Sequence, residues 1–285
     1  MAVAATGFFD GVHLGHRSVI ETLSKRSCEL GEQSLVVTFT LHPRVVLQSD
    51  ARELRLLSSH EEKLRTLQSL GVDRIVEIPF TPDFHSMTTA SYLDFLKREY
   101  DVNEVVLGYD NRIGSDLADP QKTAALAREK GMGALIAPPL LFEGAPVSST
   151  RIRKALSGGL VEQANAMLGG EYSLKGAVVG GKMLGRTIGF PTANMRLYDP
   201  LKLVPRHGVY LSRVRVQDEE YYAMTNIADV IETHIFDFSR DIYGLDIKVS
   251  LLRRLRDEMS FAGVEELKNQ LQNDEICAKK IIFER

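Results

Sequence analysis

The first half of the chain alternates between short apolar runs and longer amphipathic segments. The apolar runs, rich in alanine and β-branched residues, occupy 2–6, 34–40, 74–78, 103–107 and 134–137. The segments between them place apolar residues at helical spacing, at 17–30, 59–70, 89–100 and 120–130. Strands that alternate with helices predict βαβ units around a parallel sheet. Such sheets bind ligands at the carboxyl ends of their strands, so we expect functional residues in the loops that follow the runs.

The second half, from about residue 169, has a different pattern. Helical spacing stops, glycines become frequent, and extended runs follow one another at 174–179, 208–216, 221–226, 231–236 and 245–251. Short strands without intervening helices predict an antiparallel barrel, and an amphipathic stretch at 264–275 predicts a helix packed against it. We therefore expect an α/β chain of two domains. These are a Rossmann-like domain with a parallel sheet at 1–168 and an antiparallel β-barrel with a C-terminal helix at 169–285.

Length and composition agree with this division. A chain of 285 residues exceeds one ordinary core, and 44% hydrophobic with 26% charged residues is typical of a globular protein. The net charge of −3 gives no field that would attract nucleic acid or an anionic membrane. No apolar run is long enough to span a bilayer, and Cys28 and Cys277 have neither a disulfide framework nor metal-ligand spacing. We expect a cytoplasmic protein whose partners are small molecules, not nucleic acid or membrane.

A glycine-bearing loop at 7–16 follows the first apolar run and reads GFFDGVHLGH. Between a strand and a helix, unpaired backbone N–H groups and the helix dipole favour an anion. His13 and His16 add ring donors at the same place, which together indicate nucleotide phosphates. The loop is neither a P-loop nor the dinucleotide fingerprint. The alternative is that the two histidines only cap the helix or fill the loop.

A second motif, VSSTRIR at 147–153, opens another predicted helix. Its hydroxyl residues can cap this helix, and Arg151 and Arg153 bring fixed positive charge to the helix N-terminus. The alternative is a capped surface helix with two solvated arginines.

Together these motifs resemble a known enzyme family. The loop at 7–16 is similar to the HxGH loop of nucleotidyltransferases. With TFTLHP at 38–43, GYDNRIG at 108–114 and the VSSTRIR motif, it resembles the adenylyltransferase module of bacterial FAD synthetase. The resemblance implies a nucleotidyltransferase domain that transfers AMP from ATP to FMN, which gives FAD and pyrophosphate. The family usually has an aromatic residue where Asn111 stands, and often another where Ile113 stands.

The same resemblance implies roles for individual residues of the first domain. His13 and His16 would be catalytic, because they would stabilise the charge of the transferring phosphate. Asp10 would position the loop, Arg112 would contact the flavin, and Asp110 would contact the flavin or the adenine. The nucleotide-binding residues that it implies are Gly7, Phe9, Asp10, Gly11, Ser149, Thr150, Arg151 and Arg153.

A second glycine-rich stretch, at 176–194, lies in the predicted barrel. Its glycines permit close approach to phosphates, and the oxygens of Thr192 and Asn194 suit Mg²⁺; the alternative is a set of barrel turns. The stretch contains the element PTAN and resembles the riboflavin kinase signature, which implies phosphorylation of riboflavin to FMN by ATP. By this resemblance Glu232 is the general base, Arg256 contacts the flavin, and Mg²⁺ acts at both sites. The implied ATP and metal residues of the barrel are Gly180, Lys182, Gly185, Thr192 and Asn194.

One departure from the kinase family stands between Ala228 and Asp229. The family has a longer segment there, with a G-x-R-P-T-F core that covers the flavin. Either the protein lacks this segment or the printed sequence omits it; we favour omission, which an intact mass of 31.8 kDa would refute. Two other functions stay open: an adenylyltransferase whose barrel only binds flavin, and a non-catalytic sensor of flavin or nucleotide.

Overall fold

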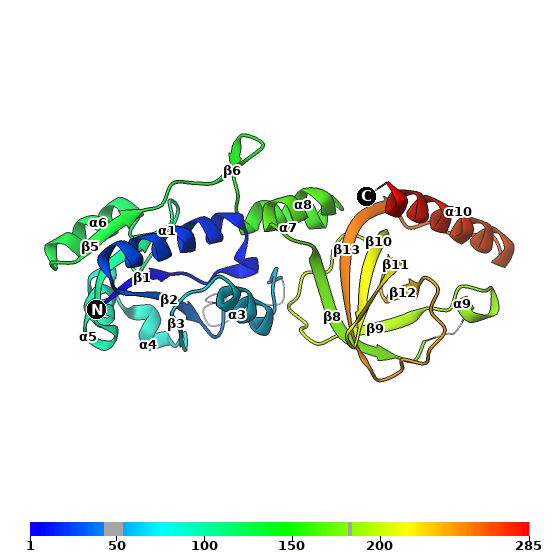
Figure 1. The fold of residues 1–285 in the computed structure, drawn as a ribbon, viewed down its shortest axis with the longest axis horizontal. Helices are drawn as coiled ribbons and strands as arrows, with labels where there is room; N and C mark the ends of the chain where they lie inside the picture. Colours follow the sequence, from blue (N-terminus) through cyan, green and yellow to red (C-terminus); the bar gives the residue numbers. More distant parts are fainter. Residues whose placement is uncertain (43–53, 182–183, 285) are drawn as a thin grey trace. The chain divides into compact units, whose positions relative to one another are not determined.

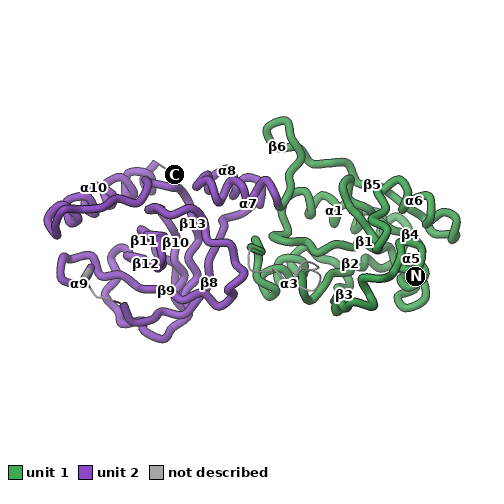
Figure 2. Tube along the Cα trace, turned by 180° about the vertical axis from the view of Figure 1, so that it is seen from behind, with its two compact units in different colours: residues 1–149 green, residues 150–285 purple. Residues whose placement is uncertain are grey.

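The computed structural model describes residues 1–42, 54–181 and 184–284 of the chain. It divides into two compact units, Met1–Ser149 and Thr150–Arg285 (Figure 2). Helix α7 (Ser149–Ser157) begins at this division and α8 (Val161–Leu168) lies in the second unit. The expected domain boundary at residue 168 stays a prediction.

The first unit is built on a five-stranded sheet in which every pair of neighbours is parallel, as the sequence predicts. The spatial order is β3-β2-β1-β4-β5, which places β1 at the centre (Figure 1). The strands in chain order are β1 (Ala2–Thr6), β2 (Gln33–Phe39), β3 (Arg74–Ile78), β4 (Val102–Leu107) and β5 (Gly133–Ile136).

Helices cover both faces of this sheet, which is why its central strands read as continuous apolar runs. Ala2 and Ala4 pack in one hydrophobic cluster with residues of α5 and α6, whereas Val3 and Ala5 pack in a second cluster with residues of α1 and α3. The elements are η1 (Asp10–Val12), α1 (Leu14–Leu30), α3 (His60–Ser69), α4 (Pro82–Ser86), α5 (Thr89–Tyr100), α6 (Pro120–Glu129), and the hairpin strands β6 (Leu141–Phe142) and β7 (Ala145–Pro146).

The second unit is a closed antiparallel barrel of six strands in the order β10-β11-β12-β9-β8-β13, which confirms the expected barrel. The sequence predicts five of these strands and misses β9, which begins at the last two residues of the glycine-rich stretch at 176–194. The strands are β8 (Tyr172–Val179), β9 (Ala193–Leu197), β10 (Gly208–Val216), β11 (Glu219–Ile227), β12 (Ile231–Ile235) and β13 (Asp246–Arg256).

Two helices accompany the barrel, α9 (Leu184–Thr187) and α10 (Val264–Phe283). The end predicted for the C-terminal helix at residue 275 is wrong, because Ala278, Ile281 and Ile282 pack in the same hydrophobic cluster as barrel residues and so extend the helix. No helix in the described ranges is long and apolar enough to cross a bilayer.

The chain passes from β11 to β12 through three residues only. The backbone N–H of Ala228 donates to the carbonyl of Val230 at 3.2 Å, which closes a tight turn. The printed sequence therefore forms a regular hairpin where the kinase family carries its flavin-covering segment. Our interpretation that a segment is omitted here stays a prediction.

Candidate functional site

The glycine loop between β1 and α1 has an unusual backbone. Phe9, Gly11 and Val12 have φ angles of 55°, 77° and 38°, so two residues with side chains adopt the left-handed region. This region disfavours L-residues and persists only where the surroundings fix it. The loop therefore has a fixed, strained path, which is common at ligand sites.

Asp10 is the group that fixes the path of this loop. Its carboxylate is 4% exposed and accepts hydrogen bonds from the backbone N–H groups of Leu57 at 2.9 Å and Ser58 at 3.2 Å. The backbone N–H of Gly11 donates to the Ser58 hydroxyl at 2.9 Å. These contacts tie the loop to the chain just before α3, as expected for a positioning residue.

The two histidines of the loop stack on each other. Their ring centroids are 3.6 Å apart with an angle of 17° between the ring planes. His13 is the N-cap of α1, and its Nδ1 accepts from the backbone N–H of His16 at 3.3 Å. A neutral His13 ring therefore carries its proton on Nε2. Burial, and next the neighbouring His13, hold the pKa of His16 well below its ordinary value of 6.5.

Nδ1 of His16 is buried and has no hydrogen-bond partner among the described residues. A buried polar atom without a partner is unusual in a folded protein and is typical of a ligand site. His16 is thus held in its neutral form with a polar ring atom available to a ligand, a state suited to hydrogen bonding with phosphate oxygens. The alternative, that these histidines only cap the helix, accounts for His13 but not for His16.

Val147 and Ser149, at the start of α7, lie against the same loop. The Ser149 hydroxyl donates to the carbonyl of Asp10 at 3.2 Å. A Cβ atom on Gly15 would lie 3.1 Å from the carbonyl of Val147, so the two segments approach closely. Ser149 is therefore brought to the glycine loop as predicted. The predicted nucleotide-binding residues of the same motif that fall in the second unit are Thr150, Arg151 and Arg153, and their roles stay predictions.

A pocket of about 320 Å³ opens beside the glycine loop at the carboxyl ends of β1 and β2. Of the residues predicted from the sequence, Gly7 and Arg112 line it, whereas Asp110 is exposed and is not among its lining residues. We call it the aromatic pocket, because its remaining lining includes Phe8, Phe39, Phe80, Phe84 and Tyr92.

The aromatic lining is the part of this site that sequence reasoning missed. Phe39 and Phe80 meet edge to face at 5.4 Å, and Phe80 and Phe84 do so at 5.7 Å. The phenylalanines come from β2 and from the chain around α4, so no local pattern joins them. Where the family usually has an aromatic residue, Asn111 donates its side-chain amide to the carbonyl of Thr6 at 2.9 Å.

The glycine-rich stretch of the barrel folds tightly around the predicted metal ligands. A Cβ atom on Gly181 would lie 2.2 Å from the side-chain amide of Asn194, and one on Gly185 would lie 2.2 Å from the carbonyl of Phe190. Only glycine permits these approaches. Asn194 pairs directly with Glu232 on the neighbouring strand β12. Two further residues predicted here are Gly180, which is exposed, and Lys182, which lies outside the described residues.

Two pockets of the barrel unit share Thr192. One of about 240 Å³, the covered pocket, is also lined by Gly185, Glu232 and Arg256. The other of about 390 Å³, the mouth pocket, is also lined by Arg240. The structure therefore brings four predicted residues to one pocket and places a predicted phosphate or metal ligand where the two pockets meet. Further lining residues of the mouth pocket that the sequence did not single out are Val178, Thr233 and Phe238.

Arg256 lines the covered pocket, and hydrogen bonds to Asp274 fix its side chain. Its Nε and Nη2 donate to Oδ2 of Asp274 at 2.9 and 2.7 Å, and Asp274 is 5% exposed. Leu267 and Leu271 of the same helix, α10, also line this pocket. No sequence pattern points to Asp274, because its partner lies 18 positions earlier on a strand.

Fold and sites define a class of protein: a two-domain transferase with an HxGH nucleotide site on a parallel sheet and a separate phosphoryl-transfer barrel. The family model for FAD synthetase matches residues 1–151, and the model for riboflavin kinase matches residues 168–282. The chain belongs to the family of bifunctional riboflavin kinases/FMN adenylyltransferases, with the FAD synthetase domain first.

Curated relatives of this family cover almost the whole chain. A bifunctional riboflavin kinase/FMN adenylyltransferase of Listeria monocytogenes is 36% identical over 96% of this chain and 90% of its own length. Those of Bacillus subtilis and Escherichia coli are 35% and 32% identical, over 96% and 98% of this chain and 90% and 92% of their own length. A Streptococcus pneumoniae crystal structure described as a macrolide-efflux protein is 31% identical, with a TM-score of 0.89 over 98% of this chain and 93% of that one.

Proposed function

We propose that the barrel transfers the γ-phosphoryl group of ATP to the 5′-hydroxyl of riboflavin, with the flavin in the covered pocket and the nucleotide in the mouth pocket. The observation that carries this assignment is Thr192, which lines both pockets and so stands between donor and acceptor. Glu232 lines the flavin side, where its carboxylate would accept the proton of the hydroxyl as the phosphorus–oxygen bond forms.

Mg²⁺ fits the residues around Thr192. A hydroxyl and an amide carbonyl are hard oxygen donors, and Asn194 lies beside Glu232 on the neighbouring strand. No group of three His, Cys, Asp or Glu side chains that could hold a metal occurs in the described part of the chain. An ion at this site would therefore share Thr192 and Asn194 with phosphate oxygens of ATP. When bound, it neutralises charge on the transferring phosphoryl group.

In the first unit, we propose that the flavin ring of FMN occupies the aromatic pocket and that ATP binds along the glycine loop. Apolar and aromatic walls suit the flat ring, and Gly7 belongs to both the pocket and the loop. His13 and His16 would donate hydrogen bonds to the α-phosphate as FMN attacks it and pyrophosphate leaves. We further propose that Arg151 and Arg153 neutralise phosphate charge and that Asp110 contacts flavin outside the pocket.

The experiment is chromatography of the products formed from riboflavin, ATP and Mg²⁺. We expect FMN first and FAD second. His16→Ala should lower FMN adenylylation by about 10²–10³ while riboflavin phosphorylation continues, by analogy with the loss of one oxyanion donor. Glu232→Gln should lower riboflavin phosphorylation and spare adenylylation of added FMN.

Matched variants control for general damage. His60→Ala removes an exposed histidine of the first unit, and Glu220→Gln neutralises an exposed glutamate of the barrel; both should leave the two activities unchanged. If His16→Ala or Glu232→Gln abolished both reactions in a folded chain, the assignment of one site to each unit would be wrong. Formation of FAD from FMN without formation of FMN would favour a barrel that only binds flavin.

A further inference from the structure

Two segments far apart in the sequence supply much of the lining of the aromatic pocket. One is α4 and its exit, which contributes Phe84, His85 and Met87. The other is the loop after β4, which contributes Asn111, Arg112, Ile113, Gly114 and Leu117. The shape of the pocket therefore depends on how firmly these segments hold each other.

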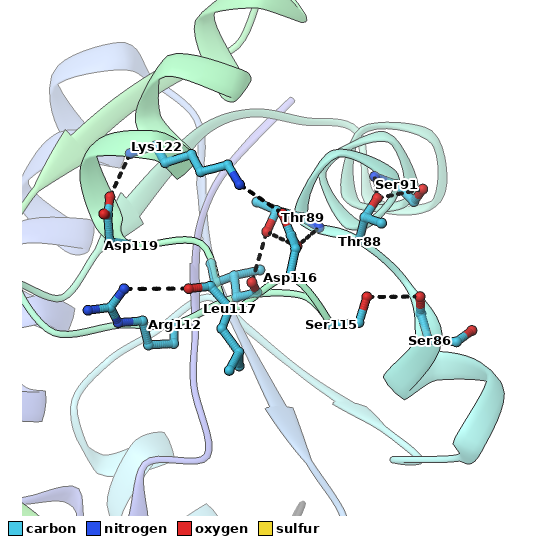
Figure 3. A network of polar contacts seen from close by, with 11 residues as sticks. Ser86, Thr88, Thr89, Ser91, Arg112, Ser115, Asp116, Leu117, Asp119 and Lys122 are labelled. Atoms are coloured by element: carbon cyan, nitrogen blue, oxygen red, sulfur yellow. Dashed lines mark hydrogen bonds and ion pairs between the residues drawn. The ribbon is translucent and has the colours of Figure 1, made fainter.

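A set of hydrogen bonds joins the loop to the chain between α4 and α5 (Figure 3). The backbone N–H of Ser115 donates to the carbonyl of Met87 at 2.8 Å, and its hydroxyl donates to the carbonyl of Ser86 at 3.1 Å. One carboxylate oxygen of Asp116 accepts from both the backbone N–H and the hydroxyl of Thr89, each at 2.8 Å. Asp116 thus receives two donors at the first residue of α5.

The burial of Thr89 and the charge of Asp116 keep their hydrogen bonds in place. Thr89 is fully buried, and its hydroxyl also lies 2.8 Å from the carbonyl of Ile113 in the same loop. The hydrogen bonds from Thr89, its backbone N–H first and its hydroxyl next, lower the pKa of Asp116 to about 2. Lys122 of α6 adds a longer ion pair at 3.4 Å. The carboxylate is therefore charged, and the link is complete, at any pH at which enzymes are assayed.

The backbone of the loop is adapted to the same contact. Gly114 has a φ of 72°, and a Cβ atom on it would lie 2.3 Å from the backbone nitrogen of Thr89. An atom cannot approach backbone this closely, so any side chain at 114 would push the loop away from α5. Asp116 and Gly114 therefore both maintain the contact between the loop and Thr89. Asp116 does so by hydrogen bonding, and Gly114 does so because it has no side chain.

We propose that Asp116 is a positioning residue for flavin: with Thr89 and Gly114 it holds the loop at 111–117 against the start of α5 and so sets the affinity of the first unit for FMN. This inference rests on the proposed placement of the flavin ring in the aromatic pocket. Asp116 and Thr89 do not line the aromatic pocket. Asp116 acts through Arg112 and Ile113, which do line it, and therefore governs binding more than the chemical step.

The test compares Asp116→Asn and Gly114→Ala in the full chain, with FMN affinity followed by quenching of flavin fluorescence and adenylylation followed by chromatography. Each variant should raise KM and Kd for FMN about tenfold, in keeping with the loss of a charge-assisted hydrogen bond, and change kcat less than about threefold. Because both act on one contact, the double variant should be less than additive. Lys122→Ala, which removes only the exposed ion pair, should stay within about twofold of wild type.

Riboflavin phosphorylation in the same chain is the internal reference and should not change. Unaltered KM and Kd for FMN in both variants would overturn the proposal, and so would a lower melting temperature with unaltered KM, because that is the signature of a purely structural role. A fall in kcat at constant KM would also contradict it. Absence of FMN adenylylation in the wild-type chain would instead defeat the proposed function, so the two failures are distinguishable.

Discussion

Lys63 is a buried charge whose energetic consequence can be worked out and measured. The residue is 2% exposed; its ammonium donates to the carbonyl of Phe39 at 2.8 Å and lies 4.2 Å from the centre of the Phe8 ring. Burial lowers the pKa of Lys63 from 10.5 to about 8, although Glu77 and Asp10 favour the charged form. Phe8 and Phe39 both line the aromatic pocket, so Lys63 contacts two residues of the pocket wall.

The sign of the pH effect follows from linkage. Below pH 8 Lys63 is charged in both the folded and the unfolded state, and the cost of burying the charge is fully present. Between pH 8 and pH 10.5 the folded state releases the proton first, so the stability of the wild type rises with pH relative to a variant without the amine. Over this whole pH range the unfolding free energy of the wild type rises by about 3 kcal/mol relative to that variant, at about 1.4 kcal/mol per pH unit.

Lys63→Met removes the charge and keeps the length of the side chain. At pH 7 we expect the variant to be more stable by about 1–2 kcal/mol, because the lost hydrogen bond to Phe39 offsets part of the 3 kcal/mol. By pH 9.5 the wild type should have gained about 2 kcal/mol on the variant, which removes or reverses the difference. Lys97→Met, at an exposed position of the same unit, should show no such dependence on pH.

Pulse proteolysis of the full chain in urea, repeated from pH 7 to pH 9.5, measures this difference, because fragments of the two units can be told apart by mass. A difference in unfolding free energy that stays constant over this range would refute the reasoning. So would a variant less stable than wild type by more than about 1 kcal/mol at pH 7.

Three other outcomes can be checked with the same protein. Gly181→Ala should lower riboflavin phosphorylation at least tenfold and leave FMN adenylylation intact, because its Cβ would meet the amide of Asn194; equal kinase rates would contradict this. Asp274→Ala should destabilise the barrel unit by about 3–5 kcal/mol in urea denaturation, and Arg256→Met in the same chain should restore part of it, because the charge left unpaired is removed. Because the pKa of His16 is held well below 6.5, kcat/KM for FMN adenylylation should stay level from pH 8 to pH 6.5; a fall centred near 6.5 would argue for an ordinary histidine.

Two errors of the sequence reading have a common physical cause. Strand β9 has no strand prediction because it begins at the end of the glycine-rich stretch, yet neighbours on both sides in the barrel supply its hydrogen bonds. The end of α10 was set too early, although packing against the barrel stabilises its later turns. In both cases tertiary contacts outweigh local preference, as they do for marginal elements in general.

The sequence by itself determined what depends on neighbours along the chain. The alternation of apolar runs and helical spacing predicts the parallel sheet and the barrel, because both periods are local. The loop at 7–16 and the stretch at 176–194 indicate nucleotide chemistry, because an anion site at the start of a helix and a tight glycine loop are each built from consecutive residues.

Only the tertiary structure decided how remote segments meet. The phenylalanines of the aromatic pocket come from different parts of the first unit, and Thr89 and Asp116 are 27 positions apart. Arg256 lies on a strand and Asp274 on a helix, and the periodicity of neither segment specifies where the two pack together. Such contacts form only when folding brings remote side chains together, and the periodicity of a sequence does not specify which remote residues become neighbours.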